Sequence, residues 1–325
     1  MNDQKVLEQI RIRNFARLLK VMRELGTCSL SQITEQMSIG LTTVKKCIEE
    51  GLSCGMILPG ETAESTGGRK AQQFLLNAGY QYELMILIDN NNLVCRVYDF
   101  NRRCLEKSQV RFEMPLFWQR LCEEITVYTA RYAVGTICLA MPCVIKDGRV
   151  TDWYYNPMMQ GFEIGLELQK RFCTHVIVQN DMKLAVRGAA AHPGEKGVKN
   201  LVVAQFGHNG VGVGEMVNGQ VLEGAAGFAG EVGHTQDRRK NIVGVAYPAK
   251  IIRNVIICIN PEKIVFYRSE RQNRFPQIFE ASVKGLPEAA VPQYTVSDAY
   301  AEDILTGMFC LMDQNGYFKK GSGSQ

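Results

Sequence analysis

Apolar positions in the first part of the chain recur at helical spacing and predict three helices. A first helix is predicted over residues 4–25, where one face collects Leu7, Ile10, Phe15, Leu18, Met22 and Leu25. Ser29 and Gln32 form a capping-box pair at the start of a second helix. A turn at residues 38–40 then leads to a third helix near residues 41–53. Two short helices joined by a brief turn that contains glycine are typical of a helix-turn-helix motif.

The third predicted helix separates its apolar side chains from its polar ones. Val44 and Ile48 would face the core of this unit. The polar side chains near the start of the helix then point outward, where a recognition helix meets base edges and phosphates. These candidate DNA contacts are Thr42, Thr43, Lys45 and Lys46.

Two short apolar runs after the third helix predict a wing. Residues 56–58 and 73–76 would pair as strands around a tip that carries Arg69 and Lys70, whose side chains reach phosphate or an adjacent minor groove. The pattern therefore predicts a winged helix-turn-helix DNA-binding domain over residues 1–78. Basic residues only slightly outnumber acidic ones in this segment. A helical protein-interaction module is the alternative interpretation.

Beyond the wing, buried strands alternate with amphipathic helices, which is typical of an α/β protein. Residues 82–89 and 92–99 predict a β-hairpin that turns at Asn90-Asn91. Further strands are predicted at 134–141, 175–180 and 263–267, and helices at 117–132, 162–172, 249–259 and 298–312.

Composition places the chain among ordinary globular proteins. The 325 residues are 46% apolar and 22% charged, which is enough to bury more than one core. No apolar run approaches the ~20 residues of a membrane span, and the eleven scattered cysteines indicate reduced thiols in the cytoplasm. A net charge of +4 neither requires nor excludes nucleic acid. Residues 319–325 are rich in glycine and serine and predict a flexible tail.

The most informative stretch runs from residue 179 to residue 234. An apolar strand ends in Asn180-Asp181, at the edge of an α/β sheet where binding sites form. A glycine-spaced segment follows at 210–214, which allows tight turns and a close approach of backbone N–H groups to an anion or a sugar hydroxyl. Glu231 and His234 come last and could present an acceptor and an imidazole to one polar ligand. Each piece alone has a plain reading: a helix cap, a β-hairpin or a core histidine.

In this order the motifs resemble the ROK family, which contains repressors and sugar kinases. The matching residues are Asn180-Asp181, Gly210-Val-Gly212-Val-Gly214, Asn218-Gly219 and Gly230-Glu231-Val-Gly233-His234. The Gly67-Gly68-Arg69 tip of the wing is also similar to that of ROK repressors. The resemblance implies an actin-like, ribonuclease H-like body of two lobes. We expect lobe I at residues 79–178 and 297–318 and lobe II at residues 179–296.

The resemblance also implies a sugar site. Asn180, Asp181, Glu231 and His234 are the expected sugar contacts. In the sugar kinases the residue matching Asp181 is a general base, and in the repressors it accepts a hydrogen bond from the sugar. Residues 153–156, Trp-Tyr-Tyr-Asn, form a polar and aromatic cluster of the kind that covers sugars. Ordinary lobe packing is the alternative for that cluster.

Three departures from the family pattern argue against nucleotide and metal binding. The phosphate turn of the kinases, Asp-x-Gly-x-Thr, reads Asp89-Asn-Asn91-Asn-Leu93 here. The Gly-Gly pair expected near adenosine is replaced by residues 267–269, Tyr-Arg-Ser. The three cysteines that would complete a zinc site with His234 are missing, since the next cysteine is Cys258. We therefore predict no catalytic residue, no cofactor and no metal.

Three functions remain open at this stage. The first is a cytoplasmic transcriptional regulator that binds operator DNA and senses a sugar or sugar phosphate, with no membrane contact. Helix-turn-helix proteins bind palindromic sites as symmetric assemblies, so a homodimer or homotetramer is expected. The second is a ROK sugar kinase, and the third is a regulator whose body has lost its ligand and serves as an oligomerisation scaffold.

Overall fold

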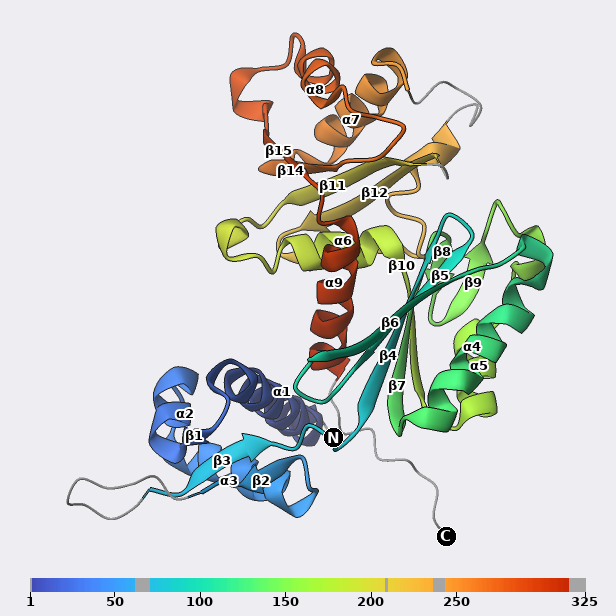
Figure 1. The fold of residues 1–325 in the computed structure, drawn as a ribbon. Helices are drawn as coiled ribbons and strands as arrows, with labels where there is room; N and C mark the ends of the chain where they lie inside the picture. The colour runs from blue at the N-terminus through green and yellow to red at the C-terminus, as the bar shows by residue number, and fades with distance from the viewer. Residues whose placement is uncertain (1, 62–70, 208–209, 236–242, 316–325) are drawn as a thin grey trace.

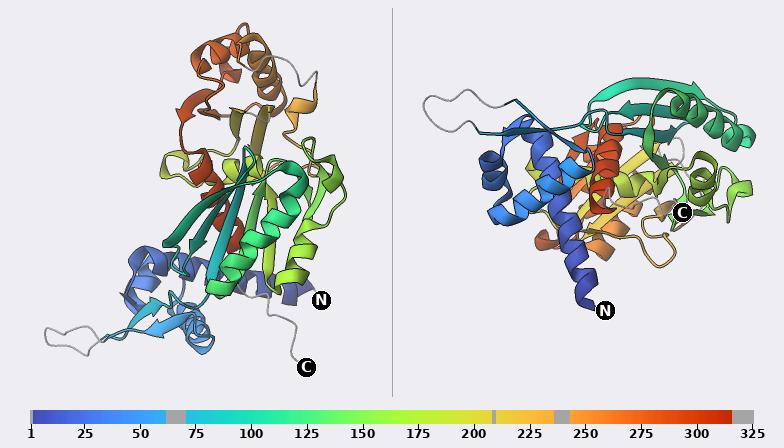
Figure 2. Two further views of the ribbon diagram at one scale, coloured as in Figure 1. Left: turned by 45° about the vertical axis from the view of Figure 1, so that its right-hand side comes forward. Right: turned by 90° about the horizontal axis from the view of Figure 1, so that it is seen from below.

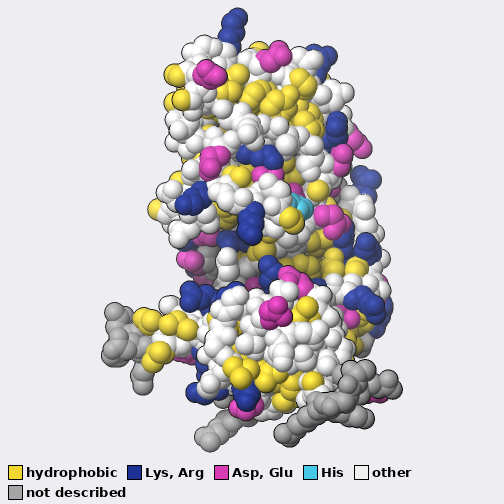
Figure 3. Space-filling view, turned by 90° about the vertical axis from the view of Figure 1, so that its left-hand side faces the viewer, with side chains coloured by type: hydrophobic (Ala, Val, Ile, Leu, Met, Phe, Trp, Pro, Cys, Tyr) yellow, Lys and Arg dark blue, Asp and Glu magenta, His cyan; other side chains and the backbone are white. Residues whose placement is uncertain are grey.

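The computed structural model describes residues 2–61, 71–207, 210–235 and 243–315. Figure 1 shows the N-terminal unit at the bottom and the two lobes of the body above it. On the face shown in Figure 3, acidic and basic side chains are interspersed over both lobes, in keeping with the small net charge of +4. Within the described residues, no helix has both the length and the apolarity needed to cross a membrane.

The N-terminal unit contains three helices and a small antiparallel sheet. The helices are α1 (Asn2–Leu25), α2 (Leu30–Met37) and α3 (Leu41–Ser53). The strands are β1 (Cys28–Ser29), β2 (Ile57–Pro59) and β3 (Gln73–Leu76), in the order β1-β3-β2. Ser29 Oγ accepts a hydrogen bond from the Gln32 backbone at 3.4 Å, and Gln32 Oε1 accepts one from the Ser29 backbone at 2.9 Å. The predicted capping box and the predicted third helix are confirmed.

The core of this unit also includes a residue of the first lobe. Val44 and Ile48 are buried in it, as the helical spacing predicts, together with Phe15 and Leu18 of α1. Phe100, which follows the strands of the first lobe, is fully buried in the same cluster. The N-terminal unit is therefore packed directly onto the body.

The first lobe is built on a five-stranded sheet in the order β10-β7-β4-β5-β6. Its strands are β4 (Tyr82–Asp89), β5 (Asn92–Tyr98), β6 (Cys104–Arg111), β7 (Val134–Met141) and β10 (His175–Asn180). Strands β10, β7 and β4 are parallel, whereas β4, β5 and β6 are antiparallel. The predicted hairpin turn is confirmed, since Asn90 and Asn91 have φ angles of 45° and 61°.

Helices cover one face of this sheet, and short elements complete the lobe. Apolar side chains of α4 (Phe117–Arg131) and α5 (Ile164–Phe172) pack with Leu84 and Ile86 of β4. The short elements are the hairpin β8 (Val144–Lys146) and β9 (Arg149–Asp152), with the 3-10 turns η1 (Met114–Leu116) and η2 (Pro157–Met159). Helix α5 begins at Ile164 rather than at residue 162 as predicted.

The second lobe is built on another five-stranded sheet, in the order β13-β12-β11-β14-β15. Its strands are β11 (Leu201–Gly207), β12 (Gly210–Val217), β13 (Gln220–Val221), β14 (Lys263–Tyr267) and β15 (Gln293–Ser297). Two helices pack on its outer face: α7 (Ala246–Ile259) and α8 (Phe275–Val283). Its 3-10 turns are η3 (Pro193–Glu195), η4 (Val232–Thr235) and η5 (Glu288–Ala290).

Two helices lie between the sheets and join the lobes. The apolar faces of α6 (Asp181–Ala189) and α9 (Tyr300–Asn315) share one core with residues of both sheets. The two helices cross with their backbones in contact: a Cβ on Gly188 would lie 1.8 Å from the Asp303 carbonyl oxygen, and one on Gly307 would lie 2.0 Å from that of Leu184. Only glycine fits at both positions. Figure 2 shows α1 beneath the first lobe, next to the end of α9.

Candidate functional site

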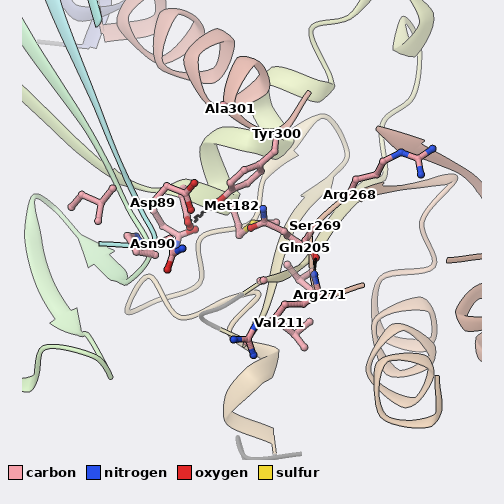
Figure 4. Close-up of a pocket in the computed structure, with 18 of the residues that line it drawn as sticks. Asp89, Asn90, Met182, Gln205, Val211, Arg268, Ser269, Arg271, Tyr300 and Ala301 are labelled. Atoms are coloured by element: carbon pink, nitrogen blue, oxygen red, sulfur yellow. Dashed lines mark hydrogen bonds between the residues drawn. The ribbon is translucent and has the colours of Figure 1, made fainter. Parts of the chain in front are cut away.

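A cavity of about 410 Å³ opens between the lobes, where the carboxyl ends of the parallel strands meet. Residues at the ends of β4, β11, β14 and β15 contribute to it, as does the start of α6. In Figure 4, Asp89 and Asn90 lie on one side of the cavity, and Arg268, Ser269 and Arg271 on the other. Its polar side chains come from Asp89, Asn90, Asn180, Asp181, Gln205, Glu231, Arg268, Ser269, Glu270, Arg271, Asp298 and Tyr300.

Asn180 is the N-cap of α6 and holds the start of that helix in place. Its Oδ1 accepts a hydrogen bond from the Lys183 backbone at 3.0 Å, and its Nδ2 donates to the Cys143 carbonyl at 3.1 Å. The residue is buried, so both polar atoms are committed to the fold. Asn180 lines the cavity, and its main effect there is to fix the position of Asp181.

Asp181 is the first residue of α6 and places a buried carboxylate in the cavity. Its Oδ1 accepts a hydrogen bond from the Met182 backbone at 2.7 Å, and its Oδ2 accepts one from the Tyr300 hydroxyl at 2.9 Å. Burial raises the pKa of Asp181 to about 7, and the nearby charges of Glu231 and Asp89 act in the same direction. The two hydrogen bonds lower this pKa in part. The carboxyl group therefore titrates near neutral pH.

Glu231 reaches the cavity because the preceding backbone lies against β12. Gly230 has a φ of 82°, and a Cβ there would lie 2.4 Å from the Val213 carbonyl oxygen. Glu231 lines the cavity with Asn180 and Asp181. The structure therefore brings together three of the four residues expected to contact sugar.

The glycine-spaced segment of β12 packs against the start of α6. A Cβ on Gly212 would lie 2.8 Å from Met182 Cγ, and one on Gly214 would lie 2.1 Å from the Met182 carbonyl oxygen. We expected these glycines to bring backbone N–H groups close to a ligand. At Gly214 the close approach is instead to the backbone of α6, so this residue positions the helix that carries Asp181.

His234 lies outside the set of residues that line the cavity. Its Nε2 is 3.1 Å from Asp152 Oδ2, and its ring packs 4.8 Å from that of Phe228. Asp152 ends β9 of the first lobe, whereas His234 belongs to the loop that carries Glu231. The imidazole therefore joins that loop to the first lobe.

The aromatic cluster at 153–156 does not cover the cavity, and that expectation is wrong. Trp153 is buried in the core of the first lobe, with its ring 4.9 Å from that of Phe117. Asn156 is also buried and donates to the Met114 carbonyl at 3.4 Å. Tyr154 and Tyr155 are exposed, and their rings stack edge-on 5.1 Å apart. The cavity lining includes none of the four residues.

Two loops that face each other across the cavity have side chains where the kinase pattern has glycines. The two-residue turn at Asn90-Asn91 is closed by the pairing of Asp89 with Asn92. Across the cavity, Arg268 Nε lies 3.3 Å from Asp298 Oδ1 in a largely exposed ion pair. Ser269 Oγ donates to the Phe206 carbonyl at 2.5 Å. The Ser269 side chain therefore fixes the loop after β14 onto β11.

Tyr300 is the main cavity residue that the sequence patterns did not reveal. It comes 119 residues after Asp181, whose carboxylate accepts its hydroxyl hydrogen. Burial raises the pKa of Tyr300 well above its usual value, and the Asp181 charge adds to that shift. The phenol therefore stays protonated and acts as a donor. A tyrosine at the start of a helix belongs to no motif, so only the fold identifies it.

Metal ligands do not gather in the described parts of the chain: no three His, Cys, Asp or Glu side chains there are grouped closely enough to hold an ion. The loop in which the ROK pattern would place zinc-binding cysteines includes residues 236–242, which lie outside the described residues. Cys258 is exposed near the end of α7.

The candidate DNA contacts on α3 are mostly accessible. Thr42, Lys45 and Lys46 are exposed, whereas Thr43 is half-buried. Arg69 and Lys70, at the tip of the predicted wing, lie outside the described residues. At the other end of α3, Glu50 forms an ion pair with Arg11 of α1. That pair joins the acidic end of α3 to α1.

Comparison with known proteins shows which family the body is similar to. Residues 92–245 match the family model "ROK family". The xylose repressor of Bacillus subtilis is 21% identical over 226 residues, which cover 67% of this chain and 58% of the repressor. The transcriptional dual regulator NagC of Escherichia coli is 22% identical over 236 residues, or 69% of this chain and 57% of NagC. The chain thus spans somewhat more than half the length of the curated relatives it matches.

Solved structures show the same fold. A ROK family transcriptional regulator, described as a homolog of the Escherichia coli Mlc protein, aligns with a TM-score of 0.69 and 15% identity over 95% of this chain and all of that chain. A ROK hexokinase from Thermus thermophilus aligns with a TM-score of 0.52 and 16% identity over 74% of this chain and all of that chain. The two lobes therefore have the actin-like fold that regulators and kinases of this family share.

Proposed function

We propose that this chain is a transcriptional regulator of the ROK family that binds DNA through residues 1–78 and senses a sugar or sugar derivative in the inter-lobe cavity. One observation carries the proposal: a three-helix unit with an exposed polar face on α3 is packed onto a body whose cavity presents Asp181 and Glu231. The curated relatives named above are a sugar repressor and a DNA-binding regulator, which supports the same function.

We infer that the N-terminal unit is a winged helix-turn-helix. Helices α2 and α3 would form the motif, and β2 with β3 would form the base of the wing. We infer that α3 enters the major groove with Thr42, Lys45 and Lys46 toward the DNA. Thr43, Arg69 and Lys70 complete the proposed contact surface. A symmetric operator would then be bound by a homodimer or a homotetramer.

The cavity is suited to a ligand rich in hydroxyl groups. Asp181 and Glu231 supply carboxylate acceptors, and hydrogen bonds to charged acceptors are stronger than neutral ones. We infer that both contact the sugar directly and that Asn180 holds Asp181 in position. His234 would support the site through its contact with Asp152, which keeps the Glu231 loop against the first lobe.

A sugar kinase is the second candidate, because kinases share this fold and have an Asp at the position of Asp181. The turn after Asp89 weighs against it. The tight turn after Asp89 has no glycine, and Leu93 is fully buried, so the hydroxyl that the kinase pattern places there is replaced by an apolar side chain. A body that binds no ligand and serves as a scaffold is the third candidate. Binding of a nucleotide would favour the kinase. Binding of neither a sugar nor a nucleotide would favour the scaffold.

The DNA-binding part is tested by the salt dependence of DNA affinity. DNA fragments enriched from random sequence with the full chain provide the probe, and fluorescence anisotropy measures Kd over a range of salt concentrations. A Lys45→Gln/Lys46→Gln variant should reduce the slope of log K against log salt by about 2, since each phosphate contact contributes about 0.9. The control Lys107→Gln/Lys250→Gln removes two exposed lysines of the lobes and should keep the slope. If the two variants had equal slopes, the proposal that α3 contacts DNA phosphates would be refuted.

A further inference from the structure

Helix α9 extends from the ligand cavity to the N-terminal unit. It contains 16 residues, so its axis is about 24 Å long. Figure 1 shows it between the two sheets, with its far end near α1. Tyr300 is its first residue and lines the cavity, whereas Asp313 lies in its last turn. One helix therefore contacts both regions to which we assign ligand and DNA binding.

At the cavity end, Tyr300 occupies an acceptor that a sugar hydroxyl would need. Its hydroxyl donates to Asp181 Oδ2 at 2.9 Å, as the dashed line in Figure 4 marks. The other oxygen of Asp181 is engaged by the Met182 backbone. The Tyr300 ring lies 5.2 Å from that of Tyr267, which packs it in place. A ligand hydroxyl that donates to Oδ2 must compete with this phenol.

In its middle, α9 is held against α6 and the second sheet. The Gly188–Gly307 crossing brings the two helix backbones into contact. Beside it, the buried Asp303 carboxylate accepts a hydrogen bond from Tyr267 at 2.6 Å, and His192 Nε2 lies 2.6 Å from its other oxygen. The ring that packs against Tyr300 is therefore tied to α9 itself. A close-packed helix of this kind transmits a displacement at one end rather than absorbing it.

At the far end, Asp313 joins α9 to the N-terminal unit. Its Oδ1 accepts a hydrogen bond from Arg102 at 2.5 Å and lies 3.7 Å from Arg23 Nη1. Arg23 belongs to the last turn of α1, its side chain is only 8% exposed, and its Nε donates to the Phe100 carbonyl at 3.1 Å. The Arg102 guanidinium also lies 4.4 Å from the centre of the Phe309 ring. Asp313 therefore sits where α9, α1 and the first lobe meet.

We propose that Tyr300 is the residue through which a bound ligand is sensed, and that α9 passes the change to α1 through Asp313. A sugar hydroxyl replaces the Tyr300 hydroxyl as the hydrogen-bond donor to Asp181 Oδ2. Because the start of α9 is then no longer bonded to Asp181, it moves relative to α6. The contact between Asp313 and Arg23 then shifts, and with it the orientation of the N-terminal unit. This role rests on the proposed function of the cavity. The ligand affects DNA binding only insofar as it binds the two arrangements of α9 with different affinity.

The linkage along α9 is tested first without sugar or DNA. Amide hydrogen exchange of the full chain is followed by mass spectrometry in wild type, Tyr300→Phe, Asp313→Asn and the control Glu302→Gln. Tyr300→Phe removes only the hydroxyl, and we expect exchange in the last two turns of α1 to rise at least ~threefold, as in Asp313→Asn. Glu302 lies on α9 and pairs with Arg96 at the surface, so its variant should match wild type. Wild-type exchange in α1 of Tyr300→Phe would overturn the proposal.

The ligand step is tested by titrating D-xylose and N-acetylglucosamine into the same variants, with DNA affinity measured in parallel. Without the competing phenol, Tyr300→Phe should bind the active sugar more tightly than wild type, and the effect of that sugar on DNA affinity should be lost. Asp313→Asn should bind sugar normally and lose the same effect. Weaker sugar binding by Tyr300→Phe would contradict the proposal, because the phenol would then be a ligand contact. Failure of the wild type to bind sugar or DNA would refute the proposed function. The hydrogen-exchange experiment uses neither ligand, so it tests the linkage along α9 independently of that function.

Discussion

Two sets of residues around the cavity differ in how they are built. In the first set, backbone packing and a helix cap present the carboxylates of Asp181 and Glu231 to the cavity. In the second set, the turn after Asp89 and the Arg268–Ser269 loop have side chains where the kinase pattern has glycine. We infer from this difference that the cavity keeps acceptors for the hydroxyl groups of a sugar and has lost the close backbone approach that phosphates need.

The largest predicted effect is a loss of stability on substitution of Gly214, which lets β12 pack on the start of α6, the helix that carries Asp181. A methyl group there would lie 2.1 Å from the Met182 carbonyl oxygen, so Gly214→Ala must displace backbone. We expect the variant to lose at least about 3 kcal/mol of unfolding free energy. Urea denaturation measures the loss. Gly233→Ala is the control, since its methyl group would meet only an ordinary contact at 3.6 Å. Equal stability of the two variants would refute the packing role of Gly214.

Alanine variants of one carboxylate from each set test which set contacts the ligand. Asp181→Ala should weaken sugar binding about 10- to 100-fold, since hydrogen bonds to a charged group contribute about 1.5–3 kcal/mol. Asp89→Ala, which removes an exposed carboxylate at the kinase-type turn, should change sugar affinity less than about threefold, a limit typical of an exposed charge. Isothermal titration calorimetry with D-xylose, D-glucose and N-acetylglucosamine measures both. The reverse order of effects would show that Asp89, and not Asp181, is the main sugar contact.

The raised pKa of Asp181 predicts a pH-dependent stability. Its folded-state pKa of about 7 lies above the ordinary value of 3.8, so its contribution to stability is full below pH 3.8 and is lost as the pH rises through 7. Ionised Asp181 should cost up to roughly 4 kcal/mol at pH 8, at about 1.4 kcal/mol per pKa unit. Asp181→Asn removes that cost and one charge-assisted hydrogen bond, so we expect a net gain of about 1–2 kcal/mol at pH 8.

Thermal unfolding of Asp181→Asn and wild type between pH 4 and pH 8 checks this prediction. The gain should disappear toward pH 4, because the wild-type carboxyl group is then neutral. Asp298→Asn is the control on the other side of the cavity, where the side chain is 80% exposed, and it should parallel wild type at every pH. A pH-independent difference between Asp181→Asn and wild type would contradict the burial argument.

The smallest effect is expected at Arg268. Its side chain is 57% exposed and already pairs with Asp298 at 3.3 Å, so Arg268→Gln should change sugar affinity less than about twofold. Calorimetry with the same sugars measures it. A large loss for one sugar phosphate, with none for the free sugar, would show that this side binds the phosphate group of an effector.

The sequence patterns predicted the elements that are strongly apolar or amphipathic. β4, β7 and β14 are continuous apolar runs, and α3 has clear helical periodicity, so each was predicted at nearly its observed bounds. Strand β15 was not predicted, because it is a partly exposed edge strand without an apolar run. Helix α8 was not predicted either, since it has only nine residues and begins at a Phe-Pro pair.

The cavity could be predicted only where its residues form a local motif. Asn180, Asp181 and Glu231 belong to an ordered series of short motifs and were all found. Tyr300 was missed because its contact with Asp181 depends on how α9 crosses α6. Trp153 was misjudged for a related reason: an aromatic side chain packs in a core or lines a site according to its neighbours, and Phe117 is remote in sequence. Contacts between distant elements need the fold.

The most direct test of the account is calorimetric titration of the wild-type chain with sugars and, separately, with Mg-ATP. The account predicts saturable binding of at least one sugar, loss of that binding in Asp181→Ala, and no binding of Mg-ATP in the presence or absence of the sugar. Saturable Mg-ATP binding, or sugar binding that persists in Asp181→Ala, would contradict the proposal that the cavity binds a sugar through Asp181 and does not bind a nucleotide.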